Sequence, residues 1–146
     1  PCTYMTNAGA VRMRVKGEID QERYRKAMEA KNFFMQFYNA DCPKIAIENP
    51  TPMRIIGLPP YTQAVQPYYF GHPFSKRTCL WLKGLQPLMP TEIMAYHEPY
   101  VNGGCKDAHE KYRRFQGRRE RDARTRSKTF PGIAKAMAEQ WAGRDK

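Results

Sequence analysis

Short apolar runs, bounded by charged residues, proline or glycine, recur along this chain of 146 residues. The clearest run occupies residues 45–47, between Lys44 and Glu48, and Pro50 follows it closely. Three consecutive apolar residues are typical of a strand buried on both faces, and proline cannot continue a ladder. The pattern therefore predicts a central strand at residues 44–48.

Helical periodicity marks two other segments. Residues 21–39 follow Asp20, a typical N-cap residue, and have an apolar face made by Ala27, Ala30, Phe34, Phe37 and Tyr38. Residues 130–141 place Pro131 in the first turn and present an apolar stripe of Ala134, Met137, Ala138 and Trp141. The sequence thus predicts one helix before the central strand and one at the end.

A second strand is expected at residues 78–83, paired with the β-rich residues 62–69 across a Gly/Pro turn. We predict an α/β fold in which a parallel sheet ends in this antiparallel hairpin. Residues 1–17 are turn-rich and are expected to form a loop that leaves a strand absent from this chain. We expect one domain over residues 1–146, with an irregular basic excursion at 85–128.

Composition narrows the function classes. The formal net charge is +11, which favours a polyanionic partner, DNA above all. No apolar run approaches the length of a membrane span, so no membrane is expected as a partner. Four widely spaced cysteines without a C-x-x-C pair favour reduced thiols and a cytoplasmic location. His97, Cys105 and His109 match no structural zinc spacing, so we expect no metal.

Two residues could carry chemistry. Glu48 ends the central strand, and in open α/β sheets ligands bind beyond the carboxyl ends of the strands. It is either a functional acid or a salt-bridge partner of a nearby arginine, and the sequence leaves both open. Cys2 offers a thiol, which becomes a nucleophile when its pKa is lowered or a base assists.

Several short motifs occur in a characteristic order: Pro1-Cys2, Glu48-Asn49-Pro50, and Phe70-Gly71-His72-Pro73 with Lys76 and Arg77 before the strand at 79–83. In this order the chain resembles the C5-cytosine DNA methyltransferases, which have a Pro-Cys loop, then Glu-Asn-Val, then a Tyr-Gly-x-Pro-Gln-x-Arg-x-Arg segment. It is most similar to the C-terminal part of small phage and prophage proteins of this kind. The sequence departs from the family pattern at Thr3, Pro50, Phe74 and Thr78.

The resemblance implies a Rossmann-like methyltransferase fold that uses S-adenosylmethionine. Cys2 would be the nucleophile, Glu48 the acid that holds the cytosine ring, and Lys76 or Arg77 a supporting cation. The glycine-rich segment that binds the cofactor is missing, which implies a fragment that is inactive by itself. Without the resemblance, Cys2 would be an ordinary cysteine, and Lys76 and Arg77 solvated turn residues.

Residues 106–128 are densely charged. The basic residues expected to contact DNA phosphates are Lys111, Arg113, Arg114, Arg118, Arg119, Arg121, Arg124 and Arg126. Tyr112 and Phe115 lie among them, which favours nucleic-acid contact over the rival interpretation, a solvated helix face.

Two alternative functions remain open at the level of the sequence. One is a basic nucleic-acid-binding module without catalysis, built on a decayed methylase scaffold. The other is an amino-group DNA methyltransferase, which needs no thiol.

Overall fold

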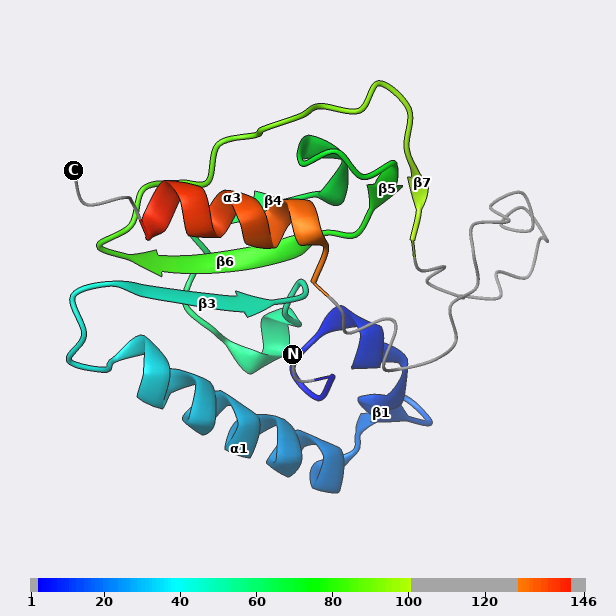
Figure 1. Ribbon diagram of the computed structural model, residues 1–146. Helices are drawn as coiled ribbons and strands as arrows, with labels where there is room; N and C mark the ends of the chain where they lie inside the picture. The colour runs from blue at the N-terminus through cyan, green and yellow to red at the C-terminus, as the bar shows by residue number, and fades with distance from the viewer. Residues whose placement is uncertain (1–2, 101–128, 143–146) are drawn as a thin grey trace. The chain divides into compact units, whose positions relative to one another are not determined.

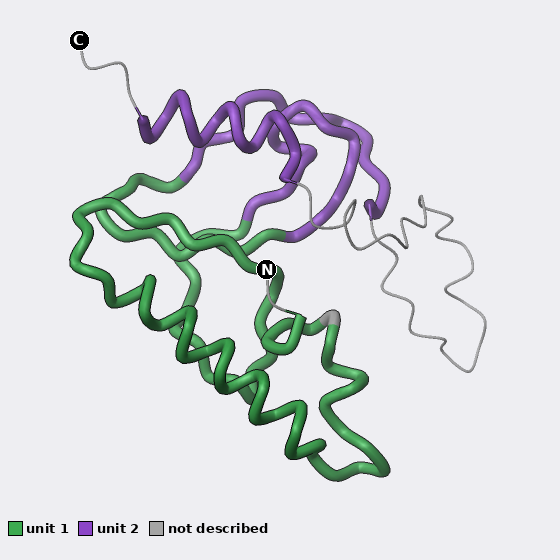
Figure 2. The backbone as a smooth tube through the Cα atoms, turned by 60° about the horizontal axis from the view of Figure 1, so that its bottom comes forward, with its two compact units in different colours: residues 1–64, 78–87 green, residues 65–77, 88–146 purple. Residues whose placement is uncertain are grey.

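The computed structural model describes residues 3–100 and 129–142, and the description below is limited to them. The fold is mixed α/β with both antiparallel and parallel strand pairs. The chain divides into two compact units, residues 1–64 with 78–87 and residues 65–77 with 88–146 (Figure 2). Each unit is described by itself.

The first unit begins with short elements rather than the turn-rich loop predicted for residues 1–17. A 3₁₀-helix, η1, spans Asn7–Arg12, and β1 (Arg14–Val15) pairs antiparallel with β2 (Glu18–Ile19). Lys16 and Gly17 have positive φ angles of 52° and 88°. Positive φ angles at both central residues close a tight two-residue hairpin. This hairpin forms where the sequence predicts a loop.

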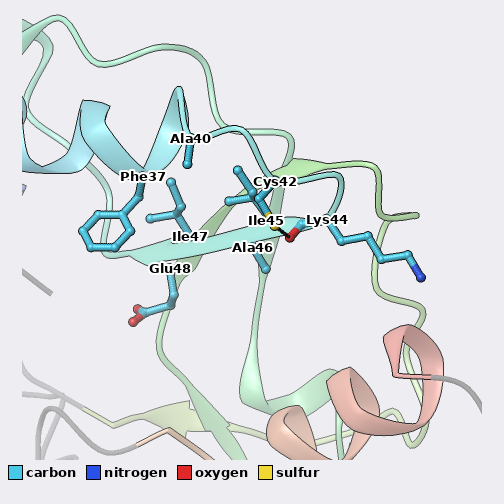
Figure 3. Close-up of a pocket in the computed structure, with 8 residues that line it drawn as sticks. All are labelled: Phe37, Ala40, Cys42, Lys44, Ile45, Ala46, Ile47 and Glu48. Carbon is cyan, nitrogen blue, oxygen red and sulfur yellow. Dashed lines mark hydrogen bonds between the residues drawn. The ribbon is translucent and has the colours of Figure 1, made fainter.

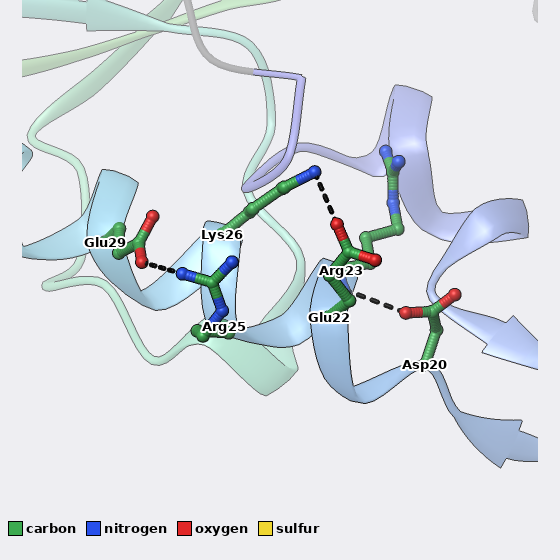
Figure 4. A network of polar contacts seen from close by, with 6 residues as sticks. All are labelled: Asp20, Glu22, Arg23, Arg25, Lys26 and Glu29. Carbon is green, nitrogen blue, oxygen red and sulfur yellow. Dashed lines mark hydrogen bonds and ion pairs between the residues drawn. The ribbon is translucent and has the colours of Figure 1, made fainter.

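Helix α1 spans Gln21–Tyr38 and begins where the sequence predicts. The carboxylate of Asp20 accepts a hydrogen bond from the Arg23 amide at 2.8 Å, which caps the first turn. Ion pairs Glu22–Lys26 and Arg25–Glu29 follow the exposed side of the helix (Figure 4). The hydrogen bond with Lys26 lowers the pKa of Glu22, but exposed pairs of this kind add little stability.

The apolar face of α1 is narrower than predicted. Ala27 and Phe34 are buried, whereas Phe37 remains 51% exposed and Tyr38 38% exposed. Phe33, on a neighbouring position, is also exposed. The helix therefore buries one stripe and leaves aromatic side chains in solvent near its C-terminal end.

A three-stranded sheet, in the order β3-β6-β4, forms the centre of the first unit (Figure 1). Its strands are β3 (Ile45–Asn49), β4 (Gln63–Val65) and β6 (Thr78–Lys83). Strand β3 is antiparallel to β6, with Ile47 opposite Trp81. The expected neighbours β4 and β6 are confirmed, although the chain leaves β4 after Val65 and continues as a 3₁₀-helix, η3 (Pro67–Tyr69).

The prediction that both faces of the central strand are buried is wrong. Ala46 and Glu48 are exposed, whereas Ile45 and Ile47 are partly buried on the opposite face. Ile47 packs against the core cluster that includes Phe34 of α1, whereas Ala46 and Glu48 lie on the opposite, exposed face. The burial of β3 therefore alternates, as in a strand covered on one side.

The core of the first unit lies between α1 and one face of the sheet. Trp81 is 2% exposed, donates a hydrogen bond from Nε1 to the Pro59 carbonyl at 2.8 Å, and packs edge-on against Phe34. Cys79, on the same strand, is fully buried. A 3₁₀-helix, η2 (Arg54–Ile56), adds Ile56 to this core.

The second unit contains short strands and one helix. Strand β5 (Phe74–Ser75) pairs parallel with β7 (Glu98–Pro99), and α3 spans Pro131–Trp141. Within the described part of the predicted excursion, 85–100, β7 is the one regular element.

Helix α3 begins at Pro131, as predicted, but its buried stripe is rotated from the expected one. Ile133 and Ala136 are buried, whereas Ala134 and Ala138 are exposed. Both apolar stripes fit the helical period, so the sequence pattern could not choose between them.

Candidate functional site

Glu48 lies near the C-terminal end of β3, with its side chain on the face of the strand opposite α1 (Figure 3). The carboxylate is exposed, and the part of the chain described supplies it with neither an ion pair nor a hydrogen bond. The salt-bridge interpretation of Glu48 therefore finds no partner there. Asn49, the next residue, is 2% exposed.

The start of β3 is held by close backbone packing. Gly84 follows β6 with φ +62°, and a Cβ there would lie 2.0 Å from the Pro43 carbonyl oxygen. Lys83 Nζ also donates to the Ala40 carbonyl at 2.9 Å, just beyond α1. These contacts fix the position at which the chain enters β3.

The segment after Cys2 lies beside the segment after Glu48. The Met53 amide donates to the Met5 carbonyl at 2.8 Å, and the Asn7 amide donates to the Thr51 carbonyl at 2.9 Å. Thr6 forms an antiparallel bridge with Pro52 between them. Cys2 itself lies outside the described residues.

Lys76 and Arg77 belong to the second unit. The Lys76 amide donates to Gln66 Oε1 at 2.8 Å, and its ammonium lies 5.9 Å from the ring centroids of both Tyr100 and Phe130. Two rings near one ammonium favour cation–π attraction. Arg77 is exposed. The structure thus describes Glu48 in one unit and the two candidate cations in the other.

A cluster that the sequence analysis did not predict surrounds the same lysine. The rings of Phe74, Tyr100 and Phe130 are mutual neighbours, with centroids 4.8–5.9 Å apart. His72 contacts Phe130, and His72 Nε2 accepts a hydrogen bond at 2.9 Å from the Gly132 amide in the first turn of α3. The sequence feature that could have indicated this cluster is the pair of Gly/Pro motifs at 71–73 and 131–132.

Tyr68 and Tyr69 are partly buried, and their rings pack against neighbouring rings. Tyr68 stacks on His97 with centroids 3.9 Å apart and planes at 10°. The Tyr68 hydroxyl donates to the Tyr69 hydroxyl at 3.4 Å, and this hydrogen bond is the main cause that raises the pKa of Tyr68. The Tyr68 ring therefore packs against both Tyr69 and His97.

An open depression of about 440 Å³ follows β3 in the first unit (Figure 3). Its wall includes Phe37 and Cys42, and side chains from both faces of β3, such as Ile47 and Glu48. Because both faces contribute, the depression runs along the open edge of the strand. It is a surface groove and not an enclosed ligand cavity.

The basic residues at 111–126 lie outside the described residues, so their proposed contacts stay predictions. Within the described ranges 3–100 and 129–142, no group of three His, Cys, Asp or Glu side chains could hold a metal ion. None of the helices described there has the length and apolar character needed to cross a membrane.

Comparison of this chain with family models, with curated proteins and with solved structures finds no match.

Proposed function

We propose that this chain is part of a DNA (cytosine-5-)methyltransferase with a Rossmann-like fold. The observation that carries the proposal is the exposed Glu48 carboxylate on a strand whose following segment lies beside the segment that follows Cys2. A strand at the sheet edge, antiparallel to its inner neighbour, also fits the end of a parallel sheet completed by a hairpin. The net charge of +11 supports a DNA substrate.

The chemistry follows from the poor nucleophilicity of cytosine C5. The Cys2 thiolate would add to C6, and the ring electrons would shift so that C5 becomes nucleophilic. S-adenosylmethionine would supply the methyl group and leave as S-adenosylhomocysteine. The C5 proton then leaves, the sulfur–C6 bond breaks, and 5-methylcytosine is released. Glu48, hydrogen-bonded to N3 and the exocyclic amine, would stabilise the charge that develops on the ring. The target base must leave the duplex to reach these groups.

Lys76 and Arg77 are the candidate supporting cations, and S-adenosylmethionine would be held by a glycine-rich segment of the kind that this sequence lacks. The basic residues at 111–126 would contact the DNA backbone. Without a cofactor-binding segment, the chain is expected to transfer no methyl group by itself.

The addition step can be tested with this chain and no cofactor. Reversible addition of a thiolate to C6 lets C5 take up a deuteron from D₂O and lose its proton, so the cytosine H5 exchanges. We expect slow exchange in a cytosine-containing oligonucleotide, measured by mass spectrometry. Cys2→Ser should abolish it because a hydroxyl is a far weaker nucleophile at neutral pH. Glu48→Gln should slow it with little loss of DNA binding.

Cys42→Ser is the matched control because Cys42 is an exposed free thiol that the mechanism does not use. Exchange that survives Cys2→Ser unchanged would refute the assignment of the nucleophile. In a longer protein that includes the cofactor segment, a duplex with 5-fluorocytosine should trap a covalent adduct through Cys2. An amino-group methyltransferase would give neither exchange nor adduct, and a binding module would give no methyl transfer.

A further inference from the structure

The open edge of β3 has backbone groups that are directed away from its one described neighbour. The Thr62 amide donates to the Leu80 carbonyl at 2.8 Å, and the Leu82 amide donates to Thr62 Oγ1 at 3.0 Å, so both leucines direct their backbone toward the β4 side. They lie opposite Glu48 and Ala46 on β3. Because antiparallel pairs alternate in their bonding, Ala46 and Glu48 direct their amides and carbonyls away from β6.

The side chains along this edge are self-complementary. In an antiparallel pairing of β3 with a second copy of itself, centred on Ala46, Lys44 lies opposite Glu48 of the copy. The same register places Ile45 opposite Ile47. Lys44, Ala46 and Glu48 are all exposed and share one face of the strand. Each opposed pair is then attractive, either by charge or by apolar contact.

Other pairings of the same edge are less favourable. A parallel, in-register pairing places like charges side by side, and a shift by one residue moves the isoleucines to the opposite face. The antiparallel register centred on Ala46 also pairs Ala46, whose backbone groups point outward, with Ala46 of the copy. Charge and hydrogen bonding therefore select the same arrangement.

The helix beside the strand contributes apolar surface to the same place. Phe37 is 51% exposed and lines the depression together with Ile45 and Ile47 (Figure 3). A strand of a second copy along β3 would bring its own isoleucines to these side chains. The covered area would thus include an apolar part as well as the paired backbone.

We propose that β3 is a homotypic interface, through which two copies of this chain pair antiparallel with the two-fold axis at Ala46. The inference concerns this chain of 146 residues. It does not rest on the methyltransferase proposal, but the dimer pairs Glu48, the acid of that proposal, with Lys44 of the second copy. A longer protein that supplied its own strand at the same edge would exclude the dimer, so the experiments use this chain.

Sedimentation velocity at low ionic strength, with reductant present, tests the two Lys44–Glu48 charge pairs of the dimer. The wild-type chain should dimerise, and Lys44→Glu or Glu48→Lys should weaken the dimer about tenfold or more by opposing like charges at two symmetric places. An equimolar mixture of the two single variants should recover dimers, because opposite charges then face each other again at both places. The double variant should also recover them.

Lys16→Glu is the matched control, since it changes the net charge by the same amount as Lys44→Glu at an exposed position outside the depression. It should leave the dimer unchanged. A wild-type chain that stays monomeric at its highest soluble concentration overturns the proposal, and would mean that Lys44 and Glu48 only protect the edge from pairing. Dimers that tolerate both single variants would place the interface elsewhere.

A cross-link tests the register directly. Opposite residues of a hydrogen-bonded antiparallel pair have Cα atoms about 5.5 Å apart, which a disulfide can span. Ala46→Cys in a Cys42→Ser background should therefore form a covalent dimer on oxidation. Val11→Cys, at a position 77% exposed in the same unit, should form it far more slowly. Equal rates would rule out a two-fold axis at Ala46.

Discussion

At the scale of single residues, Trp81 is the side chain around which the core of the first unit is packed. Its ring contacts Phe34 and Tyr61, and its indole N–H has a carbonyl partner, Pro59. The side chain combines a large apolar surface with one satisfied donor, the arrangement that buried tryptophans favour.

We therefore expect Trp81→Phe to lower the free energy of unfolding by about 1–3 kcal/mol. The variant loses the hydrogen bond to Pro59 and leaves part of the indole volume empty. Phe33→Ala, at a ring 62% exposed on α1, should change it by no more than about 0.5 kcal/mol. Urea unfolding of the two variants measures the difference, and equal effects would contradict the place of Trp81 in the core.

At the scale of elements, the turn after β6 determines where β3 starts. Gly84 has φ +62° and its α-carbon faces the Pro43 backbone, so it needs both a left-handed conformation and the absence of a Cβ. Gly17 is also left-handed, at φ +88°, but open space surrounds it. A side chain at Gly17 would therefore add conformational strain alone, whereas one at Gly84 would add strain and steric overlap.

Gly17→Ala should cost about 1–2 kcal/mol, the strain of a left-handed residue with a Cβ. Gly84→Ala should cost clearly more, because the Cβ also collides with a carbonyl oxygen and the entry to β3 must shift. Thermal unfolding compares the two variants. If Gly84→Ala lowered the stability less than Gly17→Ala, Gly84 would not pack closely against the Pro43 backbone.

At the scale of the whole molecule, the charge of +11 is the property with the broadest consequence. The residues from 106 to 128 contribute ten basic and four acidic side chains, a local charge of +6. A polyanion that bound there would release counterions, so its affinity would fall steeply with salt.

Replacement of Arg118, Arg119 and Arg121 by glutamine should weaken DNA binding and flatten the dependence of log K on log salt. Fluorescence anisotropy of a labelled duplex at several salt concentrations measures both quantities. Lys135→Gln, on the exposed side of α3, controls for the loss of a positive charge at a distant place in the sequence. If the triple variant keeps the wild-type affinity and slope, the basic run is a solvated face.

Elements governed by neighbours in the sequence could be predicted from it. The Asp20 cap and the helical period locate α1, and the apolar residues before Gly84 locate β6 at Thr78–Lys83. The strand ending at the Glu48-Asn49-Pro50 motif was predicted within one residue of β3 at either end. Caps, periods and turn residues act over a few positions, so they are legible in one sequence.

Tertiary structure decided which faces and edges those elements present. The order β3-β6-β4 places β3 at an edge of the described sheet, and packing of Ile47 against the core leaves Glu48 on the exposed face of the strand. The hydrogen bond from the Gly132 amide to His72, and the aromatic rings around Lys76, join residues far apart in the chain. Such contacts depend on long-range packing, for which a single sequence carries no periodic signal.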